Sequence, residues 1–149
     1  KAGELAKTPV SVNLADGGLC SFVMLDGGKS AFERQNVLRR AMAPLMEEQP
    51  RELVLGLFGS AEVRRENARE ALYVAWLNGV RLPTRRKKPV PRSLSKIHLY
   101  GARDPAGFAE IAAVAEANTL ARTLTALPPN ELTPAGYRQR LRQIAVLLE

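Results

Sequence analysis

Residues 53–79, LVLGLFGSAEVRRENAREALYVAWLNG, join a short apolar run, a glycine turn and a longer amphipathic pattern. Leu53–Phe58 is short and apolar, which is typical of a buried strand. Ser60 is a preferred N-cap residue, so we expect a helix to begin after it, to run toward Asn78 and to end at Gly79. The expected inner stripe of that helix consists of Ala68, Ala71, Leu72 and Ala75. This stretch therefore predicts a strand–turn–helix unit.

Predicted strands and helices also alternate on both sides of this unit. Ser30 and Glu33 form the spacing of a capping box, which marks the start of another helix. Strands are predicted at 8–14, 19–25 and 97–100, and further helices at 30–49, 104–127 and from 133 onward. The helix 104–127 has apolar residues over a wide arc, and we expect it to be buried on more than one side. This order predicts an α/β fold with a mixed, mostly parallel sheet flanked by helices.

The surface of the central helix carries charges at helical spacing. Glu62 lies three residues before Arg65, and Glu66 lies three residues before Arg69. Such pairs stabilise a solvent-facing helix side. We therefore expect two ion pairs within this helix.

The chain has the size and composition of one ordinary domain. It has 149 residues, of which 46% are hydrophobic and 25% are charged. This length is enough to bury a hydrophobic core. No apolar run is long enough to span a bilayer and no signal peptide is visible. A lone cysteine, Cys20, cannot form an internal disulfide, which favours a reducing compartment such as the cytoplasm.

The positive charge is concentrated in one segment. The net charge is +7, and the basic and acidic residues balance in residues 1–50 and again in residues 101–149. Residues 81–96 contain no acid, and this basic segment carries Arg81, Arg85, Arg86, Lys87, Lys88, Arg92 and Lys96. Such a cluster can neutralise several phosphates and bind nucleic acid without sequence specificity. The alternative is a solvated loop stiffened by proline, and the absence of aromatic residues in the segment gives no support for base stacking.

No catalytic constellation or metal site is evident in the sequence. His98, the only histidine, lies in a predicted strand and is interpreted as structural. Cys20 lies in an apolar strand and is interpreted as an inert thiol. Gly56–Ser60 lies between a strand and a helix N-terminus, where phosphates bind in many α/β proteins, but it lacks the G-K-[ST] of a P-loop. We interpret it as a tight turn, and keep a phosphate-holding role as a further alternative.

The segment 120–134, LARTLTALPPNELTP, resembles the stretch that joins the two domains of the leucyl (cytosol) aminopeptidases. The shared motif comprises Pro128, Pro129, Asn130, Glu131, Leu132, Thr133 and Pro134. Thr123, Thr125 and Ala126 depart from the family pattern of aspartate, valine and asparagine. A weaker similarity covers Lys87–Ile97, which looks like the basic, proline-containing stretch before a strand of the family's N-terminal domain.

The resemblance implies a domain boundary and a parent enzyme. It identifies 1–127 as a non-catalytic N-terminal domain with a macro-domain-like fold, and 128–149 as a linker and helix leading to a missing catalytic domain. Enzymes of this family remove N-terminal residues from peptides, use two divalent metals (zinc or manganese) and form hexamers. Their N-T-D-A-E-G-R motif is absent from this sequence, so no catalytic residue or metal ligand is carried over. The expected role is in assembly or in access to the active sites, and the alternative is a nucleic-acid-binding module.

Overall fold

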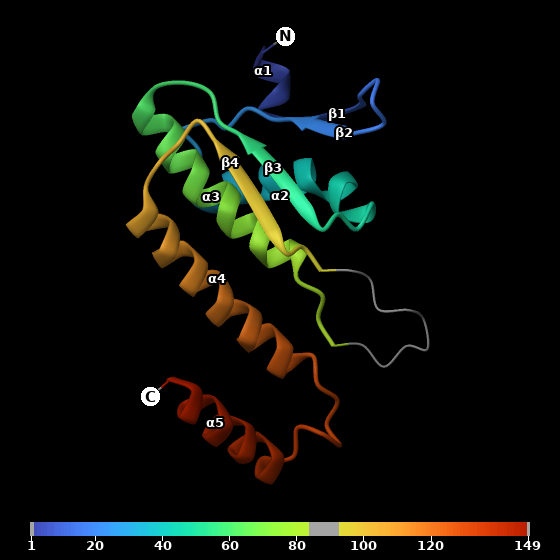
Figure 1. Ribbon diagram of the computed structural model, residues 1–149, viewed down its shortest axis with the longest axis vertical. Coiled ribbons are helices and arrows are strands. Elements are labelled where there is room, and N and C mark those ends of the chain that lie inside the picture. Colours follow the sequence, from blue (N-terminus) through green and yellow to red (C-terminus); the bar gives the residue numbers. More distant parts are fainter. Residues whose placement is uncertain (1, 84–92, 149) are drawn as a thin grey trace.

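The computed structural model describes residues 2–83 and 93–148, and its helices and strands follow the predicted alternation closely (Figure 1). In chain order the elements are α1 (Ala2–Leu5), β1 (Val10–Asn13), β2 (Leu19–Phe22), α2 (Ala31–Glu47), β3 (Glu52–Gly56), α3 (Ala61–Gly79), β4 (Lys96–Tyr100), α4 (Pro105–Thr125) and α5 (Pro134–Leu148). The short helix α1 is the one element here that the sequence analysis did not predict. No helix in the described residues is long and apolar enough to cross a membrane.

The strands form two separate pairs rather than one sheet. β1 and β2 pair antiparallel, whereas β3 and β4 pair parallel with Leu53 opposite Ile97. The prediction of an α/β fold is confirmed, and the sheet is mixed only in the sense that one pair is parallel and the other antiparallel. Strand partners depend on long-range packing, which local sequence patterns do not specify.

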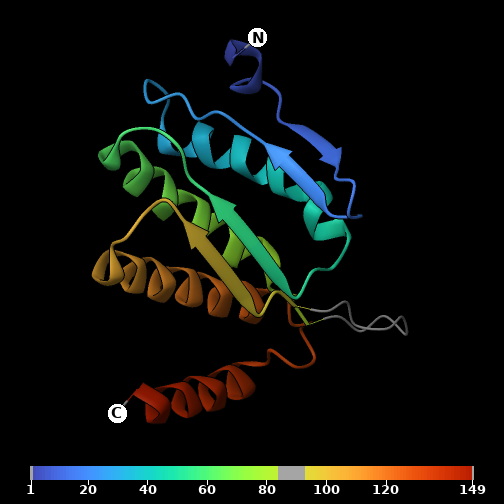
Figure 2. The ribbon, with the colours of Figure 1, turned by 45° about the horizontal axis from the view of Figure 1, so that its top comes forward.

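The hydrophobic core lies between α2, α3 and the β3–β4 pair. Its buried side chains come mainly from the helix faces and from β3, and include Leu38, Met42, Leu53, Val74 and Ala75. Figures 1 and 2 show α2 and α3 behind the β3–β4 pair, so they cover one face of it. The other face carries the exposed side chains of Val54 and Tyr100. A parallel pair is normally covered on both faces, so this arrangement leaves one sheet face open.

Capping explains where the two central helices begin. The Ser30 hydroxyl accepts a hydrogen bond from the Glu33 N–H, and the Glu33 carboxylate accepts one from the Ser30 N–H, so the predicted capping box is present. The Ser30 N–H and the Ser30 hydroxyl both donate to the Glu33 carboxylate, and these two hydrogen bonds lower the pKa of Glu33. The Ser60 hydroxyl accepts from the Val63 N–H at the start of α3. Both caps satisfy backbone donors that have no partner inside the helix.

Gly79 ends α3 as expected, and it also has a packing role there. It is the last residue of α3 and is buried. A Cβ atom at this position would lie 2.6 Å from the Cβ of Leu94, a buried core residue. The absence of a side chain at Gly79 therefore allows the segment before β4 to pack against the end of α3.

Helix α4 packs on α3 through one side only. Within α4 only Gly107 and Ala115 are buried, and the guanidinium of Arg69 on α3 reaches Glu110 at 2.7 Å and Asp104 at 3.8 Å. The expectation that α4 is buried on more than one side is therefore wrong for this chain. The expected ion pairs of Glu62 with Arg65 and of Glu66 with Arg69 are also absent from the described residues. Arg69 bridges to α4 instead.

Candidate functional site

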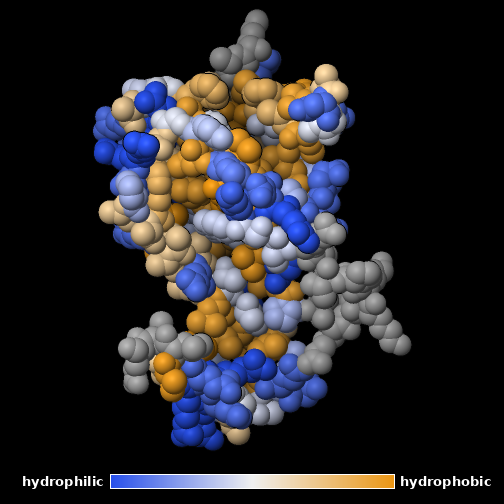
Figure 3. Space-filling view, viewed as in Figure 1, coloured by the Kyte–Doolittle hydropathy of each residue, from blue (hydrophilic) through white to orange (hydrophobic). Residues whose placement is uncertain are grey.

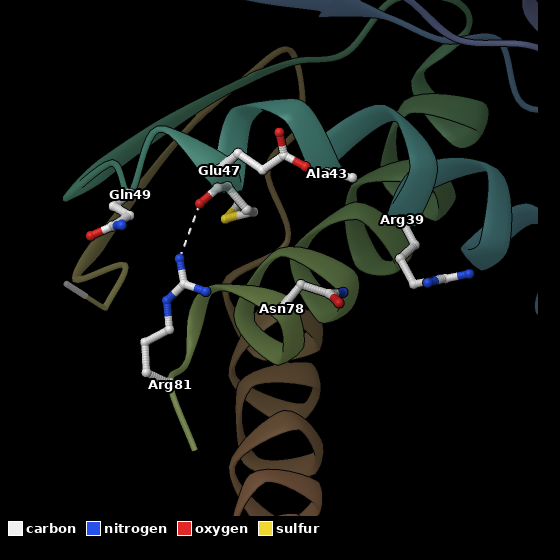
Figure 4. A pocket seen from close by; sticks show the side chains of 7 residues that line it. Arg39, Ala43, Glu47, Gln49, Asn78 and Arg81 are labelled. Carbon is white, nitrogen blue, oxygen red and sulfur yellow. Dashed lines mark hydrogen bonds between the residues drawn. The ribbon is translucent and has the colours of Figure 1, made fainter. Parts of the chain in front are cut away.

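A pocket in the described structure lies between the C-terminal ends of α2 and α3 and borders the basic segment (Figure 4). Its volume is about 400 Å³. The side chains that line it are Arg39, Ala43, Met46, Glu47, Gln49, Asn78 and Arg81. Because Arg81 is the first residue of the basic segment, this pocket is where the predicted nucleic-acid contact can be compared with the structure.

Arg81 is held by the end of α2. Its Nη2 donates a hydrogen bond to the carbonyl oxygen of Met46 at 3.0 Å. The same oxygen accepts from the N–H of Gln49, whose φ of 53° turns the chain out of the helix. The last carbonyls of a helix carry partial negative charge, so a guanidinium stabilises this end. Arg81 therefore has a structural partner at the point where the basic segment begins.

The remaining polar groups of the pocket do not converge on one point. The side-chain amide of Asn78 donates to the Val74 carbonyl at 2.7 Å. Arg39 is exposed, and its side chain points away from Arg81 in Figure 4. Glu47 adds a carboxylate to the same rim. The pocket thus offers separated charges rather than an anion clamp or a pair of groups for acid–base catalysis.

Hydrogen bonds join the two ends of the basic segment. The N–H of Leu94 donates to the Gly79 carbonyl at 2.9 Å, and the N–H of Arg81 donates to the Ser93 hydroxyl at 3.4 Å. Lys96 follows at the start of β4, where it is exposed and paired in register with Glu52. The other predicted contact residues (Arg85, Arg86, Lys87, Lys88 and Arg92) lie outside the described residues. These hydrogen bonds join the residues on the two sides of 84–92, the stretch of sequence that holds most of the basic residues.

The histidine and the cysteine lie in different strand pairs. His98 Nε2 lies 2.7 Å from Glu52 Oε2 across the β3–β4 pair. This hydrogen bond is the main cause that lowers the pKa of Glu52, and Lys96 lowers it further. Cys20 is half-buried in β2 opposite Val12. No group of three or more His, Cys, Asp or Glu residues able to hold a metal occurs in the described parts of the chain.

The turn Gly56–Ser60 connects β3 to α3 as expected. Gly59 adopts a φ of 117°, and its carbonyl accepts a hydrogen bond from Arg64 Nη1 at 2.9 Å. Gly101, at the neighbouring β4–α4 turn, has a φ of 94°, and a Cβ there would lie 2.3 Å from the Leu57 carbonyl oxygen. The two turns are therefore packed against each other through backbone atoms.

The motif 128–134 forms a hydrogen-bonded turn between α4 and α5. The Pro128 carbonyl accepts from the N–H groups of Glu131 and Leu132 at 2.9 and 3.0 Å. The Thr133 hydroxyl accepts from the Gly136 N–H at 3.1 Å, and Pro134 is the first residue of α5. The motif thus determines where α5 begins and how it leaves α4.

Comparison with known proteins gives a fold match. No family model matches the chain, and no curated protein sequence matches it. The structure is similar to that of the bottromycin maturation enzyme BotP, with a TM-score of 0.74 and 24% sequence identity. The match covers 96% of this chain and 32% of that chain, so this chain spans about a third of the length of the matched protein. This match shows the fold.

The structural match corrects the expected family assignment. The similar structure is described as a bottromycin maturation enzyme, and no family model supports a leucyl aminopeptidase. The identification of residues 120–134 as the linker of that family is therefore wrong as an assignment. The aminopeptidase activity, the two metal ions and the hexamer rested on this resemblance alone. A short motif that forms a good helix–turn–helix connection is not specific enough to establish a family.

Proposed function

We propose that this chain is a non-catalytic domain of a larger enzyme and contributes binding surface to it. The observation that carries the proposal is the extent of the fold match, which takes in 96% of this chain but 32% of a longer maturation enzyme. The fold therefore has a precedent as one part of a longer enzyme. The open face of the β3–β4 pair, which exposes Val54 and Tyr100, and the exposed alanine-rich side of α4 are further support. A parallel pair is usually covered on both faces, and exposed apolar patches are commonly covered in an assembly.

A finer statement about the fold belongs to the same proposal. Val23 and Leu25, which follow β2, pack against the core that also contains Leu53. In the complete protein we expect the two strand pairs to act as parts of one mixed, mostly parallel sheet of the macro-domain type. Additional strands or a neighbouring domain would cover the open sheet face.

The proposal is tested by the gene and by reconstitution. The reading frame that encodes residues 1–149 is expected to include a further domain. That domain and the 149-residue chain, produced separately, should bind each other in an analytical ultracentrifuge. A reading frame without a further domain would refute the proposal, and so would two parts that do not associate.

We keep nucleic-acid binding as a second candidate function of the same chain. It is favoured by residues 81–96, which contain seven basic and no acidic residues. Their charge of +7 equals the net charge of the whole protein. The test is the salt dependence of DNA binding with and without these charges.

A further inference from the structure

The outer face of α4 is an exposed apolar stripe. It consists of Ala106, Ala109, Ala113, Ala117 and Leu120, which recur every three or four residues on the side of α4 opposite α3. Figure 3 shows a hydrophobic band that follows α4 and continues toward α5. Four of these five side chains are alanines, so another helix can approach this face closely. Glu110 and Glu116 flank the stripe on its two sides.

Helix α5 has the opposite character. Its apolar face contains Tyr137, Leu141 and Ile144 at spacings of four and three residues, and the first two are about 40% exposed. Arg138, Arg140 and Arg142 flank this face, and Pro134–Leu148 contains no acidic residue. Arg138 and Arg142 form no ion pair within the described residues, and neither does Glu116 on α4. The two helix faces are thus complementary. α5 carries large apolar side chains flanked by arginines, and α4 carries small apolar side chains flanked by glutamates.

The chain does not place α5 on its own α4. α5 packs extensively on no other described helix or strand. Figures 1 and 2 both show it apart from the rest of the fold beyond the turn 126–133. The hydrogen bonds of Pro128 and Thr133 stabilise this turn, and a Cβ at Gly136 would lie 2.7 Å from the Glu131 carbonyl oxygen. The turn therefore stabilises a position of α5 in which a second molecule can bind it.

We propose that two copies of this chain form a symmetric dimer in which α5 of each copy lies on the outer face of α4 of the other. Tyr137, Leu141 and Ile144 then pack against the alanine stripe. Arg138 or Arg142 of one copy pairs with Glu116 of the other. A twofold axis makes the two contacts identical and closes the assembly at two copies.

The test measures molecular mass by sedimentation equilibrium from micromolar to millimolar protein. The wild-type chain is expected to dimerise as concentration rises. Leu120→Glu on α4 and Leu141→Glu on α5 should each raise the dimer dissociation constant by roughly thirtyfold or more, because each places a charge in the centre of the contact. Val146→Glu is the matched control: Val146 is 72% exposed and lies on the opposite side of α5, so this variant should dimerise like wild type. Circular dichroism checks that every variant is folded.

Mixing Leu120→Glu with Leu141→Glu tests whether α5 packs on α4 of another molecule or on α4 of its own chain. Leu141→Glu keeps an intact α4 face and Leu120→Glu keeps an intact α5, so a mixed dimer regains one complete contact. The mixture should associate more tightly than either variant alone. A wild-type chain that stays monomeric at all concentrations overturns the proposal. The proposal is also overturned if Leu120→Glu and Leu141→Glu both dimerise like wild type. It is overturned as well if their mixture associates no more tightly than either variant alone.

Discussion

The imidazole Nε2 of His98 lies 2.7 Å from Oε2 of Glu52 across the parallel strands β3 and β4. Lys96 is the register partner of Glu52 and adds a second positive neighbour. Both residues lower the pKa of Glu52, and the His98 hydrogen bond is the larger cause. The only histidine of the chain therefore belongs to a structural hydrogen bond on the open face of the β3–β4 pair.

His98→Asn is expected to raise the pKa of Glu52 toward its ordinary value, because the main cause of the lowering is removed. Lys96→Gln should raise it by less. The measurement is an NMR titration of the Glu52 side-chain carboxyl carbon in the three proteins. Identical titration curves in wild type and His98→Asn would show that the hydrogen bond does not lower this pKa.

The same pair makes stability depend on acid pH. A carboxyl whose pKa is lowered by folding contributes stability above its unfolded pKa, and loses it as the pH falls through the folded value. Glu52→Gln should therefore be less stable than wild type at neutral pH. The difference should begin to shrink as the pH falls below about 4, the ordinary glutamate range, and should vanish only below the lowered folded pKa. Urea unfolding at several pH values measures this. A difference that persists at acid pH would have another cause.

Gly79→Ala is expected to destabilise the fold although alanine favours helices. The new Cβ would lie 2.6 Å from the Cβ of buried Leu94, and overpacking of this kind costs about 1–3 kcal/mol. The gain in helix propensity is about 1 kcal/mol and offsets only part of that cost. Gly27→Ala is the control, because nothing lies within 4 Å of a Cβ there. Equal unfolding free energies for the two variants in urea would contradict the predicted clash.

The helix boundaries could be predicted because their signals are local. Ser30, Ser60 and Asp104 each accept a hydrogen bond from a backbone N–H in the first turn of the following helix. The pairing of β3 with β4 joins residues more than 40 positions apart, and the partners of Arg69 lie on a different helix. Such contacts depend on how elements pack, so sequence spacing gave the wrong partner for Arg69.

The candidate site could be predicted only in part. The basic segment is visible in the composition, but the bond from Arg81 to Met46 spans 35 residues and has no local signal. The wide apolar arc of α4 can also be read from the sequence, and it predicts burial within the chain on more than one side. Hydrophobicity indicates that a face needs a cover but does not say which molecule provides it. The exposure of the outer face of α4 could therefore be established only from the structure.

Arg34 and Glu70 connect α2 to α3 through a two-pronged ion pair, and removing it should cost about 1–3 kcal/mol. The Nε of Arg34 lies 3.0 Å from Oε1 of Glu70, and its Nη2 contacts the same carboxylate. The side chains are only 23% and 15% exposed, so water screens the pair weakly. Arg34→Met leaves the carboxylate of Glu70 without this partner.

The matched control for this pair is Lys29→Met. Lys29 pairs with Glu33 at 3.4 Å, but these side chains are 56% and 51% exposed. Exposed pairs contribute roughly 0–1 kcal/mol, so this variant should unfold almost like wild type. Thermal unfolding of both variants compares them, and an equal loss of stability would refute the importance of burial.

DNA binding should depend on the charges of the basic segment rather than on net charge alone. Changing Arg85, Arg86, Lys87 and Lys88 to glutamate is expected to abolish binding of a fluorescent DNA duplex at moderate salt. Neutralising the same four residues with glutamine should reduce the slope of log affinity against log salt by about 3–4, since each phosphate contact contributes about 0.9. The control changes the exposed residues Arg39, Arg40, Arg65 and Arg103 instead, which alters the net charge equally. If both sets reduce affinity and slope by the same amount, the protein binds through its overall charge, and the segment between Arg81 and Lys96 is not a nucleic-acid site.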